Sequence, residues 1–316
     1  MTSSSLAPAS PKPALIATPT PLRVVSVSLG SSQRNHTAQA TLLGREFSIE
    51  RRGTDGDLTA ARAAIAELDG QVAAIGLGGI DLYVVAGTRR YVMRDAAKLA
   101  SAAKITPVVD GSGLKDTLER ATVRRLQSEG ILDFKNKNVL VVSAVDRFGM
   151  AEELAATGAH CVFGDLLFNL GLNIPVRSMR MVRRLAAWML PAVTKLPFKM
   201  LYPTGDKQNE IVDSAAHRRQ MEAAEIIAGD FLLIRRYLPA RLDGKTILTN
   251  TTTPRDLELL RERGLKQLIT TTPEFGGRSF GTNVMEGIFV ALGARTAPEY
   301  LALLEKLKWE PRVLEF

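Results

Sequence analysis

The chain has 316 residues, of which 46% are hydrophobic, so it is long and apolar enough to bury the cores of two domains. Its formal net charge of +8 favours anionic ligands, but only 6% of residues are aromatic, so nucleic acid is not indicated as a partner. A single cysteine excludes an internal disulfide and indicates a reducing, cytoplasmic setting. The three histidines and this cysteine lack the spacing of a zinc site, so no metal is expected.

Residues 1–22 are rich in Ser, Pro, Ala and Thr, which predicts a disordered tail. No apolar run approaches the ~20 residues that span a membrane, so no membrane partner is expected. The expected partners are a small anionic or hydroxylated molecule and, in a homo-oligomer, other copies of the chain.

Residues 23–135 alternate between strand and helix patterns and predict an N-terminal α/β sandwich, taken as a substrate domain. A strand over 23–30 is followed by a hairpin around Gly44 and a helix with Asp57 as its N-cap. The later predicted elements are strands over 72–75 and 106–109 and helices over 94–103 and 115–130.

Residues 136–316 contain five short apolar runs joined by helical patterns, which predict a Rossmann-like, doubly wound, mostly parallel sheet. The runs lie near residues 139–142, 161–163, 225–230, 245–250 and 267–272. Because ligands of such sheets bind beyond the carboxyl ends of the strands, the polar residues that follow these runs are the candidate site.

The stretch from Asn138 to Asp165 predicts a strand, a turn into a helix, and a second strand that ends in an acid. Free N–H groups at that helix start favour a phosphate, and an acid at the end of the second strand suits a ribose hydroxyl of NAD better than NADP. Where a glycine fingerprint would stand, the chain reads SAVDRFG, so an ordinary turn capped by Asp146 is the alternative. The candidate cofactor-binding residues are Ser143, Arg147, Phe148, Gly149, Met150, Asp165, Asn250 and Thr251.

The glycine-rich segment DGSGLKDTLER places Lys115 near a helix start, where the helix dipole opposes its charge. A lysine there suits a ligand or an acid–base role, with Asp110 or Asp81 as its carboxylate partner. The alternative is a solvated lysine that pairs with Glu119 one turn later. Farther along, Asn283 follows a glycine-rich loop and is expected to face the cleft.

A basic helical segment contains Arg177, Arg180, Arg183 and Arg184 and is expected to be broken by Pro191 and Pro197. An acidic surface, a partner helix or simple solvation would each suit it.

The late run KTILTNTTTPRDLELLRERGLKQLITTTPEFGG resembles the shikimate/quinate dehydrogenase group in its order of strand, threonine-proline turn, helix and glycine-containing loop. The blocks SVSLGSS, GTDGD, GLGGIDLY, VVDGSGLK, AVDRFGMAE and RSFGTNVME, spread over residues 23–316, are similar to the quinate 5-dehydrogenase family.

This resemblance implies NAD(P)-dependent oxidation of a cyclic polyhydroxy acid such as quinate or shikimate. Lys115 would match the family's lysine, Asp110 its catalytic aspartate, and Ser28 and Ser31 its carboxylate-binding serines. Two alternatives stay open. One is a non-catalytic nucleotide- or metabolite-binding protein. The other is an enzyme for a phosphorylated metabolite, with Arg147, Arg278 and Lys115 converging on it.

Overall fold

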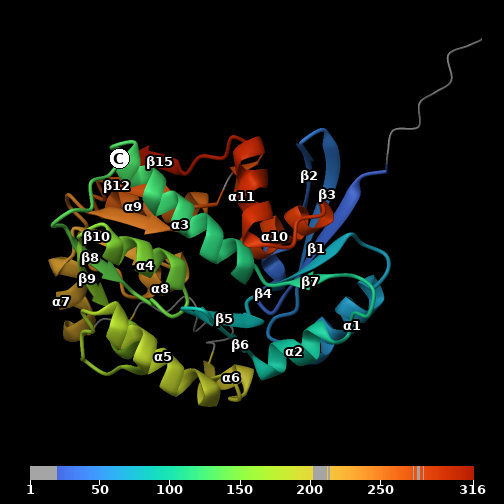
Figure 1. Cartoon of the computed structure of the whole chain (residues 1–316), viewed down its shortest axis with the longest axis horizontal. Coiled ribbons are helices and arrows are strands. Elements are labelled where there is room, and N and C mark those ends of the chain that lie inside the picture. Colours follow the sequence, from blue (N-terminus) through green and yellow to red (C-terminus); the bar gives the residue numbers. More distant parts are fainter. Residues whose placement is uncertain (1–19, 202–211, 213, 273, 276–277, 280) are drawn as a thin grey trace, which may run out of the picture.

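In a computed structural model of the chain, the first lobe is built on a five-stranded sheet of order β2-β3-β1-β4-β7 (Figure 1). Only the hairpin pair β2–β3 is antiparallel, and the other neighbours are parallel. The structure describes residues 20–201, 212, 214–272, 274–275, 278–279 and 281–316. The strands are β1 (Leu22–Ser28), β2 (His36–Leu42), β3 (Arg45–Gly53), β4 (Ala74–Gly78) and β7 (Val108–Val109).

The second lobe is built on a six-stranded sheet of order β15-β12-β11-β10-β8-β9. All neighbours are parallel except the edge strand β15. Numbered along the chain, the parallel strands run 2-1-3-4-5, the order of flavodoxin-like doubly wound sheets rather than the 3-2-1-4-5-6 order of the dinucleotide-binding fold. The strands are β8 (Asn138–Val141), β9 (His160–Phe163), β10 (Ile226–Gly229), β11 (Thr246–Thr249), β12 (Gln267–Thr270) and β15 (Arg312–Glu315).

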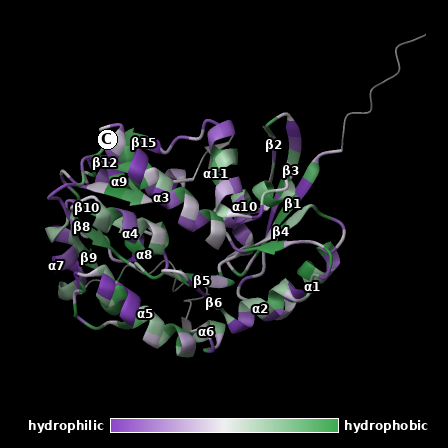
Figure 2. Ribbon diagram, viewed as in Figure 1, coloured by the Kyte–Doolittle hydropathy of each residue, from purple (hydrophilic) through white to green (hydrophobic). Residues whose placement is uncertain are grey.

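Helices cover both faces of each sheet, and central strands such as β4, β8 and β10 are largely apolar (Figure 2). In the first lobe, α1 (Leu58–Leu68) and α2 (Arg94–Ala100) cover one face. In the second lobe, α4 (Phe148–Ala156) and α5 (Met179–Val193) cover one face. The helices α7 (Ala215–Ala223), α8 (Phe231–Arg236) and α9 (Pro254–Glu262) cover the other.

Helix α3 (Ser112–Ser128) is shared by the two lobes. Leu114 and Leu118 in its first half join the core of the first lobe, whereas Val123 and Leu126 in its second half join the core of the second. The late helices α10 (Thr282–Ala291) and α11 (Ala297–Lys306) return to the first lobe and cover the second face of its sheet. The core of the first lobe is therefore completed by residues far along the chain. The predicted division at residue 136 stays a prediction.

The mixed α/β architecture with two mostly parallel sheets agrees with the predicted class, and the five predicted strands of the second sheet are present. Asp57 caps α1, as predicted, by accepting hydrogen bonds from the N–H groups of Thr59 and Ala60. Strand β2 is longer than predicted, and the strands that were not predicted are β5 (Tyr83–Ala86), β6 (Arg89–Val92), β13 (Glu274–Phe275), β14 (Arg278–Ser279) and β15.

Helix α5 continues past Pro191 to Val193, so the predicted break there is wrong. Proline removes one hydrogen bond, but Pro191 lies on the exposed face, where water can bind the freed carbonyl. Short elements complete the fold: η1 (Ser32–Arg34), the π-helical turn η2 (Asp165–Asn169), α6 (Phe198–Leu201), β13 and β14.

Candidate functional site

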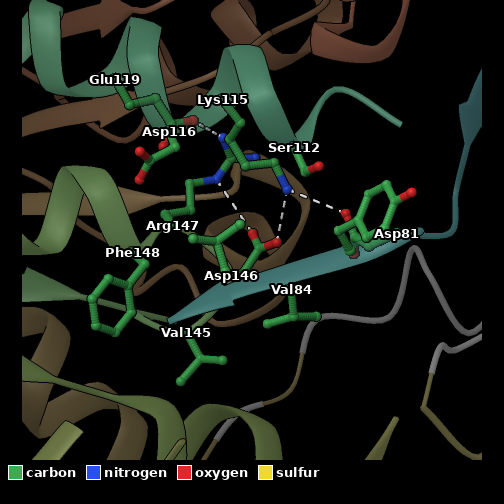
Figure 3. A pocket seen from close by; sticks show the side chains of 12 residues that line it. Asp81, Val84, Ser112, Lys115, Asp116, Glu119, Val145, Asp146, Arg147 and Phe148 are labelled. Carbon is green, nitrogen blue, oxygen red and sulfur yellow. Dashed lines mark hydrogen bonds and ion pairs between the residues drawn. The ribbon is translucent and has the colours of Figure 1, made fainter. Parts of the chain in front are cut away.

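Lys115 lies between the lobes and bridges two carboxylates (Figure 3). Its Nζ is 3.2 Å from Asp81 Oδ1, in the loop after β4, and 2.9 Å from Asp146 Oδ1, in the turn between β8 and α4. Burial alone would lower the pKa of Lys115, but Asp146 and Asp81 outweigh it and raise that pKa above its ordinary value. Burial is likewise outweighed at Asp146, where Lys115 and Arg147 lower the pKa. Lys115 is therefore held as an ammonium, which is unsuited to accept a proton.

Arg147, at the start of α4, extends this network into the second lobe. Its guanidinium contacts the fully buried Glu119 of α3, and its Nη2 lies 3.0 Å from Asp230 Oδ2 at the carboxyl end of β10. Burial raises the pKa of Glu119 to about 7, although Arg147 and Lys115 oppose this. The second oxygen of Glu119, Oε2, is buried without a hydrogen-bond partner. The network thus contains a carboxyl group that titrates near neutral pH.

A cavity of about 20 Å³ adjoins Lys115, which is room for about one water molecule. Strand β5 closes one side of it with Tyr83, Val84 and Val85. Its lining carries four carboxyl groups and two cations, so it has a net negative charge when all are ionised. These groups are Asp81, Asp116, Glu119 and Asp146, and Lys115 and Arg147.

The turn between β8 and α4, which was expected to hold a pyrophosphate, holds a carboxylate of the chain instead. Asp165 accepts hydrogen bonds from the N–H groups of Ala144 at 3.0 Å and Val145 at 2.9 Å. Ser143 Oγ lies 3.4 Å from Asp165 Oδ1 and accepts from Asn169 Nδ2. Burial raises the pKa of Asp165, and the backbone hydrogen bonds oppose that shift. Asp165 therefore occupies the position of an anion and is not directed at a ribose.

The start of α4 is packed closely against α3. A Cβ on Gly149 would lie 2.6 Å from Asp116 Oδ1 and 2.7 Å from the Asp116 backbone oxygen. Phe148 and Met150 are buried in the core of the second lobe. Gly149 thus permits close packing of α4 on α3. This packing, rather than the predicted approach of a ligand, accounts for a glycine at this position. NAD itself stays a prediction.

Asp110 is not the partner of Lys115. Its Oδ2 accepts hydrogen bonds from the N–H groups of Leu82 and Tyr83, and its Oδ1 accepts from the N–H and hydroxyl of Ser112. These four bonds fix the base of the β5–β6 hairpin and the start of α3. Of the two predicted partners, Asp81 therefore pairs with Lys115 and Asp110 does not, and Lys115 and Glu119 do not form the alternative pair.

The other predicted substrate-binding residues lie inside the first lobe. Ser28 Oγ accepts hydrogen bonds from Gly30 N–H and from Arg51, and Ser31 caps η1 by accepting from Gln33 N–H. Asn283 Nδ2 donates to Ser26 Oγ at 2.8 Å, so Asn283 faces β1 rather than the cavity.

The predicted residues at the end of β11 belong to a polar chain along the carboxyl edge of the second sheet. Asn250 Nδ2 donates to Asp230 Oδ2, and its Oδ1 accepts from Phe231 N–H and Thr249 Oγ1. Thr251 follows it and is half-buried. Through Asp230, this chain reaches Arg147 and the cavity. The side chain of Arg278 lies outside the described residues.

Two carboxyl groups were missed from the sequence as functional candidates. From the sequence, Glu119 is expected only as a surface partner of Lys115. Its helical spacing from the buried apolar residues of α3 is the signal that could have identified it as buried. Glu286 of α10 accepts hydrogen bonds from Gly111 N–H at 2.7 Å and Tyr300 Oη at 3.0 Å. Burial and the nearby Asp110 raise the pKa of Glu286 to about 7. Among the described residues, no cluster of His, Cys, Asp and Glu could hold a metal ion.

The solved structures that are similar to this chain are distant from it. A sugar ABC transport substrate-binding protein from Bordetella parapertussis is 12% identical, with a TM-score of 0.34, over 94% of this chain and 90% of that one. GanP, a glucose-galactose binding protein from Geobacillus stearothermophilus, is 9% identical, with a TM-score of 0.37, over 93% and 97%. A glutamate dehydrogenase from Thermus thermophilus is 12% identical, with a TM-score of 0.39, over 92% and 70%. No curated protein matches.

The predicted quinate or shikimate dehydrogenase activity, and with it the resemblance to that group, is wrong. No comparison points to such an enzyme, and sugar-binding proteins recur among the matched structures. The geometry agrees with this correction, because Lys115 is a fixed ammonium, Asp110 is engaged elsewhere, and Asp165 fills the turn.

Two family models match the chain. One is described as a domain of unknown function (DUF8753) and matches residues 23–110. The other matches residues 113–316, which is more than half of the chain. The chain therefore belongs to the family described as Domain of unknown function (DUF8754).

Proposed function

We propose that the chain binds a small, uncharged, hydroxyl-rich solute in the cavity beside Lys115, between the lobes. The observation that carries this proposal is the lining of the cavity, where fixed carboxylates outnumber cations. Carboxylates accept hydrogen bonds from hydroxyl groups, and the ammonium of Lys115 donates to them. An anionic solute would be repelled by the excess negative charge.

The carboxylates are held in place by charge pairs within the chain. Asp81 and Asp146 both contact Lys115, so their positions are set before any solute arrives. Ligand groups that are fixed in advance lose less conformational entropy on binding. Tyr83 adds an aromatic ring at the rim, over which the Arg90 guanidinium lies at 3.2 Å from the ring centroid.

The solute enters when the β5–β6 hairpin moves away from Lys115. A cavity of 20 Å³ is too small for a sugar, and β5 provides one of its walls. The hairpin is held at its base, where Asp110 binds the N–H groups of Leu82 and Tyr83 and where Met93 N–H donates to Leu82 O. Its strands Tyr83–Ala86 and Arg89–Val92 are half-buried or exposed, which suits a flap hinged at that base.

A thermal-shift screen of neutral pentoses, hexoses and polyols, each beside its carboxylated counterpart, tests the proposal. Neutral members should raise the melting temperature in a saturable way, and Asp81→Asn should remove the effect because one fixed acceptor is lost. Asp243→Asn, at an exposed pair with Arg241, is the matched control and should respond like the parent chain. Stabilisation by the carboxylated members alone would overturn the proposal.

A further inference from the structure

The outward face of α5 combines exposed apolar and cationic side chains. Val182, Ala186 and Leu190 are buried and follow each other at four-residue spacing, so they define the inward face. Trp188 and Met181 lie on the opposite face, 79% and 46% exposed. Because a helix turns once in 3.6 residues, Arg180 and Arg184 lie on that same outward face.

The charged residues of α5 and of the segments that flank it in the sequence are all basic. Between Asp165 and Asp206 the sequence contains six Lys or Arg residues and no acidic residue. Within the described part of the chain, Arg183 pairs with Glu152 at the side of α5, whereas Arg180 and Arg184 have no ion-pair partner. Figure 2 shows this helix in both purple and green.

Further large apolar side chains are exposed on both sides of α5 along the chain. Leu172 and Ile174, in the segment before it, are 49% and 54% exposed, and Met200 of α6 is 70% exposed. Apolar side chains that protrude from a helix can insert into the headgroup layer of a lipid bilayer. Tryptophan is favoured where an apolar layer meets water.

We propose that this face of α5 docks onto an anionic lipid surface, with Trp188 and Met181 entering the headgroup layer and Arg180 and Arg184 binding lipid phosphates. Charge complementarity selects this occupant, because Arg and Lys beside Trp and Met are what anionic bilayers attract. No helix in the described residues is long and apolar enough to cross a membrane, but a docked helix lies in the plane of the surface and needs no spanning length. The expectation that the chain has no membrane partner rested on the lack of a spanning apolar run, which does not bear on a helix docked at the surface.

Docking at α5 would involve a segment that links the two lobes. The α5–α6 segment runs from the second lobe to the first, where Thr194 O accepts from Arg94 N–H and Asp95 Oδ2 accepts from Phe198 N–H. Phe198 is buried in the core of the first lobe.

Flotation with phosphatidylcholine vesicles, with and without phosphatidylserine, tests the docking. The full chain should float only with phosphatidylserine, and the double variant Arg180→Glu/Arg184→Glu should bind at least about tenfold more weakly. Arg255→Glu/Lys266→Glu, at exposed positions on and after α9, changes the net charge equally and should float like the parent chain.

Tryptophan fluorescence gives an independent measurement, because the only other tryptophan, Trp309, is 8% exposed. Phosphatidylserine vesicles should shift the emission to the blue, and Trp188→Phe should abolish the shift while Trp309→Phe keeps it. Equal binding to both vesicle types would overturn the proposal. So would a dimer, or a complex with an acidic peptide or nucleic acid, that depends on Arg180 and Arg184 while vesicles do not bind.

Discussion

Asp165 accepts two hydrogen bonds from the backbone N–H groups of Ala144 and Val145, at the switch point of the second sheet. In doubly wound sheets this is where a bound anion is expected, so the chain supplies its own anion there. In this structure, the stretch with the predicted order of strand, turn, helix and acid therefore holds the Asp165 carboxylate in its turn.

Replacing Asp165 by Ala should lower the free energy of unfolding by ~2–4 kcal/mol, because two buried N–H groups lose their acceptor. Urea unfolding measures this. Asp243→Ala, at an exposed position, should cost less than about 1 kcal/mol.

Sulfate should partly restore the Asp165→Ala variant by occupying the vacated turn. Sulfate also stabilises folded proteins in general, so the parent chain is the necessary reference. The expected result is a saturable rise in melting temperature that is larger in the variant, and an equal rise in both would contradict the anion-site interpretation.

Arg147 and Glu119 form a buried pair whose single removal should be costly. Arg147→Met removes the guanidinium that contacts the buried carboxylate of Glu119. The substitution should lower the free energy of unfolding by about 3–5 kcal/mol. The double variant Arg147→Met/Glu119→Met should recover part of the loss, as measured in a double-mutant cycle from urea unfolding. Strict additivity of the two single losses would show that the pair is not coupled.

Stability should fall between pH 4.5 and pH 7 through Glu286 and Glu119, whose pKa values are raised from 4.5 to about 7. In this window the folded chain holds protons on these two groups that the unfolded chain has released, so the stability that they contribute is fully present below pH 4.5 and is lost as pH rises to 7. Each group contributes up to about 1.4 kcal/mol per pH unit. Glu286→Gln should roughly halve the slope in urea unfolding series, and an unchanged slope would exclude Glu286 as a source.

Gly149→Ala should separate the packing role of this glycine from a ligand role. The added Cβ would meet the backbone of α3 at Asp116, which cannot yield as a flexible side chain can, so a loss of ~1–3 kcal/mol is expected. Ala156→Ser, exposed on the same helix, should cost about 0.5 kcal/mol. If Gly149→Ala leaves the free energy of unfolding unchanged, α3 and α4 can move apart to accommodate the added methyl group, which would contradict the packing role.

Much of the fold follows from local sequence patterns. Uninterrupted apolar runs predicted the five parallel strands of the second sheet, and Asp57 marked a helix start by its capping side chain. The edge strand β15 and the strand β6 escaped prediction because half-exposed strands such as these have no continuous apolar run.

The candidate site was predictable only in part. Sequence reasoning selected Lys115 and Asp81, whose residue types and glycine-rich context are local, and the structure brings them together. It could not assign Asp165 to Ala144 or Asp110 to Leu82, because carboxylate partners are set by tertiary contacts far apart in the chain. The same limit applies to α10, whose return to the first lobe no local pattern indicates.

Calorimetric titration of the parent chain with a neutral sugar and with its uronic acid tests the central claim most directly, because the two differ mainly in one carboxylate. The excess of carboxylates around Lys115 predicts saturable binding of the neutral sugar found in the screen and at least about tenfold weaker binding of the acid. Asp81→Asn should weaken binding of the neutral sugar. Tighter binding of the acid, or binding of the neutral sugar that Asp81→Asn leaves unchanged, would contradict the assignment of this cavity.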